Sequence, residues 1–272
     1  MLLDCRRVQV VASATAFGCC LASTSPIATA AGVVDVVGIR VGMPLKEAAE
    51  TLKVHNPRID WRPNQVEFDL IPGVTFTTAI YGQENARYKG ALFQREKIVV
   101  ESMPGPPPAV VTGVYRALNL EGDEVTTFES VMQSLEKKYG KPATKLGSAD
   151  SWMWQFNSDG QPFMPTSQCN PNVFGRGNNS FGIGGASQYV RSEIAKIPNL
   201  VEWTPNCRSF VWVVIRRSTS NNALVTGITT YASDEVLRTA RIQATAKTLQ
   251  QRSDANSKKE KQEASARPAP KF

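Results

Sequence analysis

The sequence predicts an α+β fold of two similar units, each a helix packed on an antiparallel sheet, followed by a C-terminal helix and a disordered tail. Two amphipathic helical segments, within 42–57 and 126–139, are each followed by strand-like apolar runs. A third helical segment begins near residue 233, and the chain after residue 251 is polar and charged. We therefore expect a first unit at 31–122, a second unit at 123–251 and a disordered tail at 252–272.

The first thirty residues have the pattern of a secretory signal peptide. Two arginines precede a mostly apolar run at 8–22, and Ala-Thr-Ala at 28–30 fits the small-x-small rule of signal peptidase. We expect cleavage after residue 30, which gives a periplasmic or secreted protein without a stable transmembrane anchor. Two alternatives stay open, namely a retained membrane anchor and lipidation at Cys19.

Export changes how the cysteines are interpreted. Only Cys169 and Cys207 remain in the mature chain, and two cysteines in an exported protein most simply form one disulfide. The loop of about 37 residues between them would contribute roughly 3–4 kcal/mol on the chain-entropy model. His55 is the only histidine and lies far away in the sequence, so we expect neither a Cys–His catalytic pair nor a zinc site. No cofactor is expected.

The first unit begins with a short strand or extended segment at 33–41. Pro44 suits the first turn of the helix that follows, and Asn56-Pro57 ends it. Four apolar residues share one face of that helix: Leu45, Ala48, Ala49 and Leu52.

Several strand-like runs complete the first unit. We expect strands at 66–71, 74–81, 97–103 and 110–119. The polar stretch 83–90 is expected to be a connection. Residues 104–108 contain four prolines, which predicts a stiff extended loop and a candidate contact surface.

The second unit opens with the clearest helix signal in the chain. Thr126 and Glu129 have the spacing of a capping box, and Gly140 with Pro142 provides a stop. An apolar stripe follows helical spacing: Phe128, Val131, Leu135 and Tyr139.

Strands are expected again after this helix. Residues 152–156 form a strand with its aromatic side chains on one face, and 210–216 pairs with 223–231 in a hairpin whose turn lies at 220–222. Ser233 is expected to cap a last helix that ends near residue 251.

A long insertion at 161–206 separates these strands. It is rich in glycine, but it has neither a dinucleotide-binding nor a phosphate-loop pattern, and Ser180 and Ser187 lack the context of a catalytic serine. We expect a loop tethered by the disulfide, which is also a second candidate contact surface.

The formal net charge of +7 is spread along the chain. The segment 252–272 has six basic and three acidic groups, and no region has the dense basic patch of a nucleic-acid footprint. We therefore expect no nucleic-acid partner and a solvated tail, with contact to anionic lipid or nucleic acid as the alternative.

The helical segments carry a family resemblance. The pattern Gly42-Met43-Pro44 with Glu47-Ala48 and Leu52 resembles the small outer-membrane assembly lipoproteins of the BamE (SmpA/OmlA) type and the repeats of β-lactamase-inhibitor-like proteins. The pattern Leu-x-x-Lys-Tyr-Gly-x-Pro, residues 135–142, is similar to one in uncharacterised exported proteins of proteobacteria. The resemblance implies helices packed on an antiparallel sheet and a protein-binding role. It assigns no functional residue.

The sequence thus favours a non-enzymatic envelope protein that binds another protein or a cell-envelope component. No catalytic residue is assigned. One alternative is a hydrolase that uses a carboxylate pair from Asp69, Glu101, Asp150 and Asp159. Another is a carbohydrate-binding module that uses the aromatic face of Trp152, Trp154 and Phe156.

Overall fold

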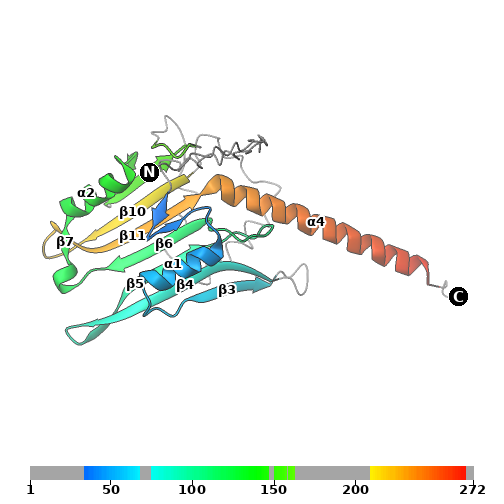
Figure 1. Cartoon of the computed structure of the whole chain (residues 1–272), viewed down its shortest axis with the longest axis horizontal. Helices are drawn as coiled ribbons and strands as arrows, with labels where there is room; N and C mark the ends of the chain where they lie inside the picture. The colour runs from blue at the N-terminus through cyan, green and yellow to red at the C-terminus, as the bar shows by residue number, and fades with distance from the viewer. Residues whose placement is uncertain (1–33, 68–74, 147–149, 158, 163–208, 268–272) are drawn as a thin grey trace, which may run out of the picture.

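One antiparallel sheet of nine strands runs through the protein (Figure 1). The computed structural model describes residues 34–67, 75–146, 150–157, 159–162 and 209–267. The main path of the sheet is β3 (Arg62–Glu67), β4 (Thr75–Tyr88), β5 (Ala91–Glu101), β6 (Gly113–Asn119), β11 (Leu224–Asp234), β10 (Ser209–Arg217), β9 (Ser151–Phe156) and β8 (Thr144–Lys145). The short strand β7 (Thr126–Thr127) pairs with β11 beside this path.

The predicted fold class of two α+β units was wrong. Strands dominate the described chain, and they form a single sheet because β6 pairs with β11 from Gly113↔Ser233 to Asn119↔Gly227. These partners are more than one hundred residues apart, and local periodicity carries no information about such pairing. The boundary expected between residues 122 and 123 falls between β6 and β7 and stays a prediction.

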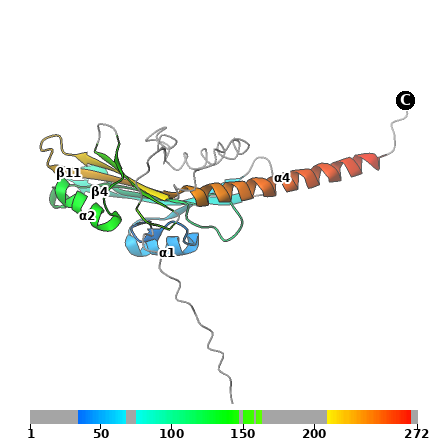
Figure 2. The same cartoon turned by 90° about the horizontal axis from the view of Figure 1, so that it is seen from above.

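Two helices and a small hairpin lie on one side of this sheet. They are α1 (Leu45–His55), α2 (Phe128–Tyr139) and the pair β1 (Asp35–Val36) and β2 (Ile39–Arg40). Figure 2 shows α1 and α2 on the same side of the strands. A 3-10 turn, η1 (Gly122–Glu124), leads from β6 to β7.

The predicted apolar stripes of both helices contribute to one core. Leu45, Ala48 and Leu52 of α1 are buried, and Val131 and Tyr139 of α2 join the same cluster. The strands supply the other members, among them Val100, Val114, Trp154, Val211 and Val213. The core therefore lies between the sheet and the layer that holds α1, α2 and the β1–β2 hairpin.

The start of α2 differs from the expected capping box. Thr126 pairs with Val225 in the sheet, and Thr127 is the capping residue, with its Oγ1 accepting from the Ser130 amide at 3.2 Å. The sequence prediction placed the cap one residue too early, at Thr126, because two threonines precede the apolar stripe. At the other end, Gly140 has φ 82°, a conformation that favours glycine, as expected.

The stretch 83–90 is not a polar connection. Strand β4 continues to Tyr88, and the chain turns at Lys89-Gly90, both with positive φ, before β5 begins at Ala91. The polar residues of β4 are matched across the hairpin, for example by the pairing of Glu84 with Glu96. The polar residues at 83–88 therefore face partners on the neighbouring strand β5 and do not form a loop.

The last helix is longer than expected. Helix α4 (Glu235–Ser265) extends away from the sheet (Figures 1 and 2), so the predicted disordered tail is wrong as far as residue 265. The segment 252–265 is rich in Lys, Glu, Gln and Ala, which are good helix formers even without apolar burial. Asp234, not Ser233, caps the helix, since its Oδ1 accepts from the Leu237 amide at 2.8 Å.

Other predictions agree with the structure or fall outside it. The strand at 152–156 and the hairpin of β10 and β11 are confirmed. The signal peptide, Cys19, Asp69, Cys169, Cys207 and nearly all of the insertion at 161–206 lie outside the described residues. In the described part of the chain, no helix has both the length and the apolar character needed to cross a membrane.

Candidate functional site

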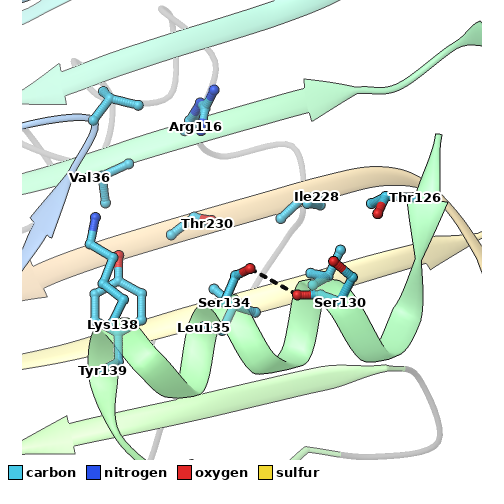
Figure 3. Close-up of a pocket in the computed structure, with 12 residues that line it drawn as sticks. Val36, Arg116, Thr126, Ser130, Ser134, Leu135, Lys138, Tyr139, Ile228 and Thr230 are labelled. Carbon is cyan, nitrogen blue, oxygen red and sulfur yellow. Dashed lines mark hydrogen bonds between the residues drawn. The ribbon is translucent and has the colours of Figure 1, made fainter. Parts of the chain in front are cut away.

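A groove lies between α2 and the β1–β2 hairpin, above strands β6 and β11 (Figure 3). Its volume is about 420 Å³. Its residues come from segments that are far apart in sequence: Val36, Val37, Arg116, Thr126, Ser130, Val131, Ser134, Leu135, Lys138, Tyr139, Ile228 and Thr230. The groove therefore exists only once α2 and the hairpin are both seated on the sheet.

The groove combines an apolar lining with hydroxyl groups. Val131 and Leu135 come from α2 and Ile228 comes from β11, and all three also contact the core. Ser134 donates to the Ser130 carbonyl at 2.9 Å. Among the described residues, the hydroxyls of Thr126, Ser130 and Thr230 have no hydrogen-bond partner. They are available to a bound group, and the partly buried apolar atoms of Leu135 and Ile228 beside them can be covered by the same group.

One end of the groove is fixed by contacts to Asp35. Lys138 Nζ lies 2.9 Å from the Asp35 carboxylate, and the Tyr139 hydroxyl donates to the Asp35 carbonyl at 2.7 Å. Burial raises the pKa of Tyr139, so its hydroxyl keeps the proton that it donates. In Figure 3 Lys138, Tyr139 and Val36 lie together at this end, while Thr126 lies at the other.

Arg116 connects the groove to a carboxylate network, which consists of Glu84, Glu96, Asn56, His55 and Arg116. Arg116 Nε lies 2.7 Å from Glu96 Oε1, and His55 Nε2 lies 3.1 Å from the same oxygen. Asn56 donates through Nδ2 to Glu84 at 2.8 Å and to Glu96 at 3.3 Å. The two carboxylates stand opposite each other on β4 and β5, and the amide between them reduces their repulsion.

The electrostatics of this network hold Glu96 in its ionised form. Burial alone would raise the pKa of Glu96, but Arg116, His55 and Asn56 together lower it below its ordinary value. Glu84 is contacted by two further guanidinium groups, Arg58 at 2.8 Å and Arg95 at 3.6 Å. The arrangement neutralises charge and fixes the end of α1 on the sheet.

The carboxylates considered for a hydrolase lie in different places. Glu101 is buried on β5 and accepts from the Tyr231 hydroxyl at 3.1 Å, whereas Asp150 binds Arg217 through both oxygens at 2.6 and 2.9 Å. The strand pairing through β6 and β11 places Glu101 at the same height along the strands as Phe210 of β10. Asp150 lies at the height of Ile215, whose amide donates to the Asp150 carbonyl. These heights differ by about 17 Å along the strand, so Glu101 and Asp150 cannot act as a pair.

Within the described ranges, neither Asp159 nor the predicted aromatic face contributes to a site. Asp159 is exposed in the turn after β9. Trp154 and Phe156 are only 1% and 3% exposed and Trp152 packs against the same core. The predicted aromatic face is therefore part of the interior and does not form an exposed platform for a sugar ring.

The proline-rich segment 104–108 holds α4 against the sheet. Arg241 donates to three carbonyl oxygens, those of Met103 at 3.0 Å, Pro106 at 3.1 Å and Pro108 at 3.2 Å. Burial lowers the pKa of Arg241. The segment that the sequence suggested as a free contact surface is thus partly occupied by the protein's own helix.

Two further results bear on the site. Within the residues that the structure describes, no group of three or more His, Cys, Asp or Glu side chains is placed to hold a metal ion. Comparison with family models, with curated proteins and with solved structures gives no significant match. The resemblance to BamE-type lipoproteins therefore stays a prediction.

Sequence reasoning did not find the groove. Ser130 and Ser134 are polar residues beside the apolar stripe of α2, and such positions on a helix ordinarily face water, while Thr126 lies just before the helix in β7. Their only distinctive signal is that they are small and uncharged, while the other side of α2 carries Gln133, Glu136 and Lys137. The β1–β2 hairpin that completes the groove comes from a segment about ninety residues away.

Proposed function

We propose that this protein is a non-enzymatic binding protein of the cell envelope and that its groove beside α2 receives an extended segment of a partner protein. The observation that carries this proposal is the lining of the groove. Apolar atoms of Val131, Leu135 and Ile228 stand next to hydroxyls without partners, so one surface offers both burial and hydrogen bonds. A peptide presents these two kinds of group in alternation.

The charged residues at the groove favour recognition over chemistry. Lys138 and Arg116 each have a carboxylate partner, Asp35 and Glu96 respectively. Such pairs position side chains and keep the groove in shape before a partner arrives. A preformed surface of this kind loses little conformational freedom on binding, which favours affinity.

The location in the envelope rests on the N-terminal pattern. The arginines, the apolar run at 8–22 and Ala-Thr-Ala at 28–30 support export through a cleavable signal. N-terminal sequencing of the protein recovered from the periplasm or medium tests this part. A chain that starts at Ala31 supports it, an intact Met1 contradicts it, and lipid on Cys19 replaces it with a lipoprotein.

The groove is tested by photo-crosslinking in cells. A photoreactive phenylalanine analogue replaces Ser134, which lines the groove, and in a matched variant it replaces Gln133, the exposed neighbour on α2. We expect position 134 to crosslink to one defined segment of one partner, identified by mass spectrometry, and position 133 not to do so. Equal products from both positions would contradict the groove as the contact.

Blocking the groove gives an independent measurement. Ser134→Trp fills the space between α2 and the hairpin, so it should lower the affinity for the crosslinked segment by at least tenfold, measured with a synthetic peptide. Gln133→Trp adds the same bulk on the exposed side and should leave the affinity within about twofold. An unaffected affinity in Ser134→Trp would assign the contact to another surface.

A further inference from the structure

A buried polar cluster holds the first turns of α4 to the sheet. Its members are Glu101 of β5, Tyr231 of β11, and Glu235 and Arg238 of α4, and none of the four is more than 4% exposed. Arg238 Nη1 lies 3.9 Å from Glu101 Oε2 and 3.8 Å from Glu235 Oε1. The same nitrogen donates to the Tyr231 hydroxyl at 3.0 Å, and that hydroxyl donates to Glu101 at 3.1 Å.

The cluster has more acidic groups than basic ones. Among the described residues, two carboxylates, Glu101 and Glu235, face the one guanidinium of Arg238, and Asp234 caps the helix next to them. Ser233 donates to Glu235 at 2.6 Å. A buried carboxylate without its own cation is costly, and the cost disappears when the group takes up a proton.

We infer that the attachment of the first turns of α4 to the sheet responds to pH in the neutral range, with Glu235 as the group that gains and loses the proton. The change is local because the next attachment, Arg241 on the carbonyls of Met103, Pro106 and Pro108, contains no acidic group. This property goes beyond the proposed function and does not depend on it.

The surroundings of Glu235 set the direction of the response. Burial raises the pKa of Glu235 to about 7, with Glu101 and Asp234 acting in the same sense and Arg238 and Ser233 acting against it. Burial and the neighbouring Glu101 also raise the pKa of Tyr231, so that residue stays protonated throughout the range concerned. The folded pKa of Glu235 thus lies above its ordinary value of 4.5. Protonated Glu235 therefore favours the attached helix at low pH, and this contribution is lost as the pH rises through about 7.

Hydrogen exchange of the full chain, read by mass spectrometry and corrected for intrinsic exchange rates, tests this inference. We expect protection of the amides in the first two turns of α4 to fall by roughly ten- to a hundredfold between pH 5 and pH 8. Peptides from α2, which lacks such a buried carboxylate, provide the internal reference and should keep constant protection.

Two variants make the result decisive. Glu235→Gln carries a neutral group of the same shape at every pH, so it should keep the high protection of the low-pH state up to pH 8. His55→Gln removes the only histidine and should leave the pH response of α4 intact. Constant protection in the unaltered protein, or an unchanged response in Glu235→Gln, would overturn the inference.

Discussion

Glu96 is a buried carboxylate that remains charged because neighbouring side chains compensate the cost of burial. Its side chain is 6% exposed, yet it stays ionised because Arg116 and His55 contact one of its oxygens and Asn56 donates to the other. Hydrogen bonds to a charged group each contribute more than those between neutral groups. The carboxylate therefore joins the end of α1, strand β6 and the groove in one set of contacts.

Replacing this carboxylate should be costly. Glu96→Gln keeps the size of the side chain but leaves Arg116 without its ion pair, so we expect a loss of about 2–3 kcal/mol in the free energy of unfolding. Urea denaturation measures the loss. Glu50→Gln, on the exposed side of α1, is the control and should change stability by less than about 0.5 kcal/mol.

The same residue should also make stability depend on pH. The folded pKa of Glu96 is lowered, so its contribution is present above the ordinary value of 4.5 and is lost as the pH falls through the folded pKa. Unfolding free energies between pH 6 and pH 3 should therefore decline less steeply in Glu96→Gln than in the unaltered protein. Parallel curves for the two proteins would show that Glu96 does not titrate as described.

Helices α1 and α2 illustrate how far periodicity predicts an element. The spacing of Leu45, Ala48 and Leu52 was sufficient to find α1 with its buried face, and the stripe of α2 was found in the same way. Periodicity does not say how deeply a stripe is buried, because that depends on what stands beside it. Leu52 is 0% exposed, but Leu135 is only partly buried because it lines the groove.

The two leucines should therefore differ in their contribution to stability. Leu52→Ala leaves a closed cavity and should cost about 3–5 kcal/mol, whereas Leu135→Ala opens into the groove and should cost about 1–2 kcal/mol. Chemical denaturation of both variants gives the comparison. Equal losses would mean that Leu135 is as fully enclosed as Leu52.

Helix α4 is held in place by contacts of Arg238 and Arg241 that no sequence pattern predicts. The polar segment 252–265 forms the second half of α4, and Arg238 and Arg241 attach the first turns of this helix to the rest of the protein. The contact of Arg241 with the carbonyls of Met103, Pro106 and Pro108 could not be predicted from the sequence, because the two segments are more than 130 residues apart.

Removing this contact should loosen two segments together. Arg241→Gln loses the three-carbonyl contact, so limited proteolysis should cleave both the 104–108 segment and the root of α4 several times faster. Arg252→Gln, at an exposed position farther along α4, should leave both rates unchanged. Faster cleavage in α4 alone would show that the proline-rich segment is held by other contacts.

At the scale of the molecule, the pairing of β6 with β11 is the feature that the sequence could not supply. The strands themselves were expected, and the hairpin of β10 and β11 was placed by its turn. The strand β6 is the second neighbour of β11 because side chains that are far apart in the sequence pack against each other across the two strands, including Tyr115 opposite Tyr231. The groove depends on the same packing, because it lies above these two strands.

One continuous sheet should unfold as one unit. We expect urea unfolding followed by circular dichroism to coincide with unfolding followed by tryptophan fluorescence in the double variant Trp61→Phe/Trp203→Phe, which retains only Trp152, Trp154 and Trp212, on β9 and β10. Separate midpoints for the two signals would indicate that the halves on either side of the β6–β11 pairing unfold independently.

The outermost strands limit what can be added to this sheet. At one edge β3 carries Pro63, which has no amide hydrogen to offer, with the charged Arg62 beside it. At the other edge β8 pairs through only two residues, Thr144 and Lys145. A strand from another copy would find few consecutive backbone groups at either edge. The protein can therefore have a sheet eight strands wide from β3 to β8 without extending it from molecule to molecule into an aggregate.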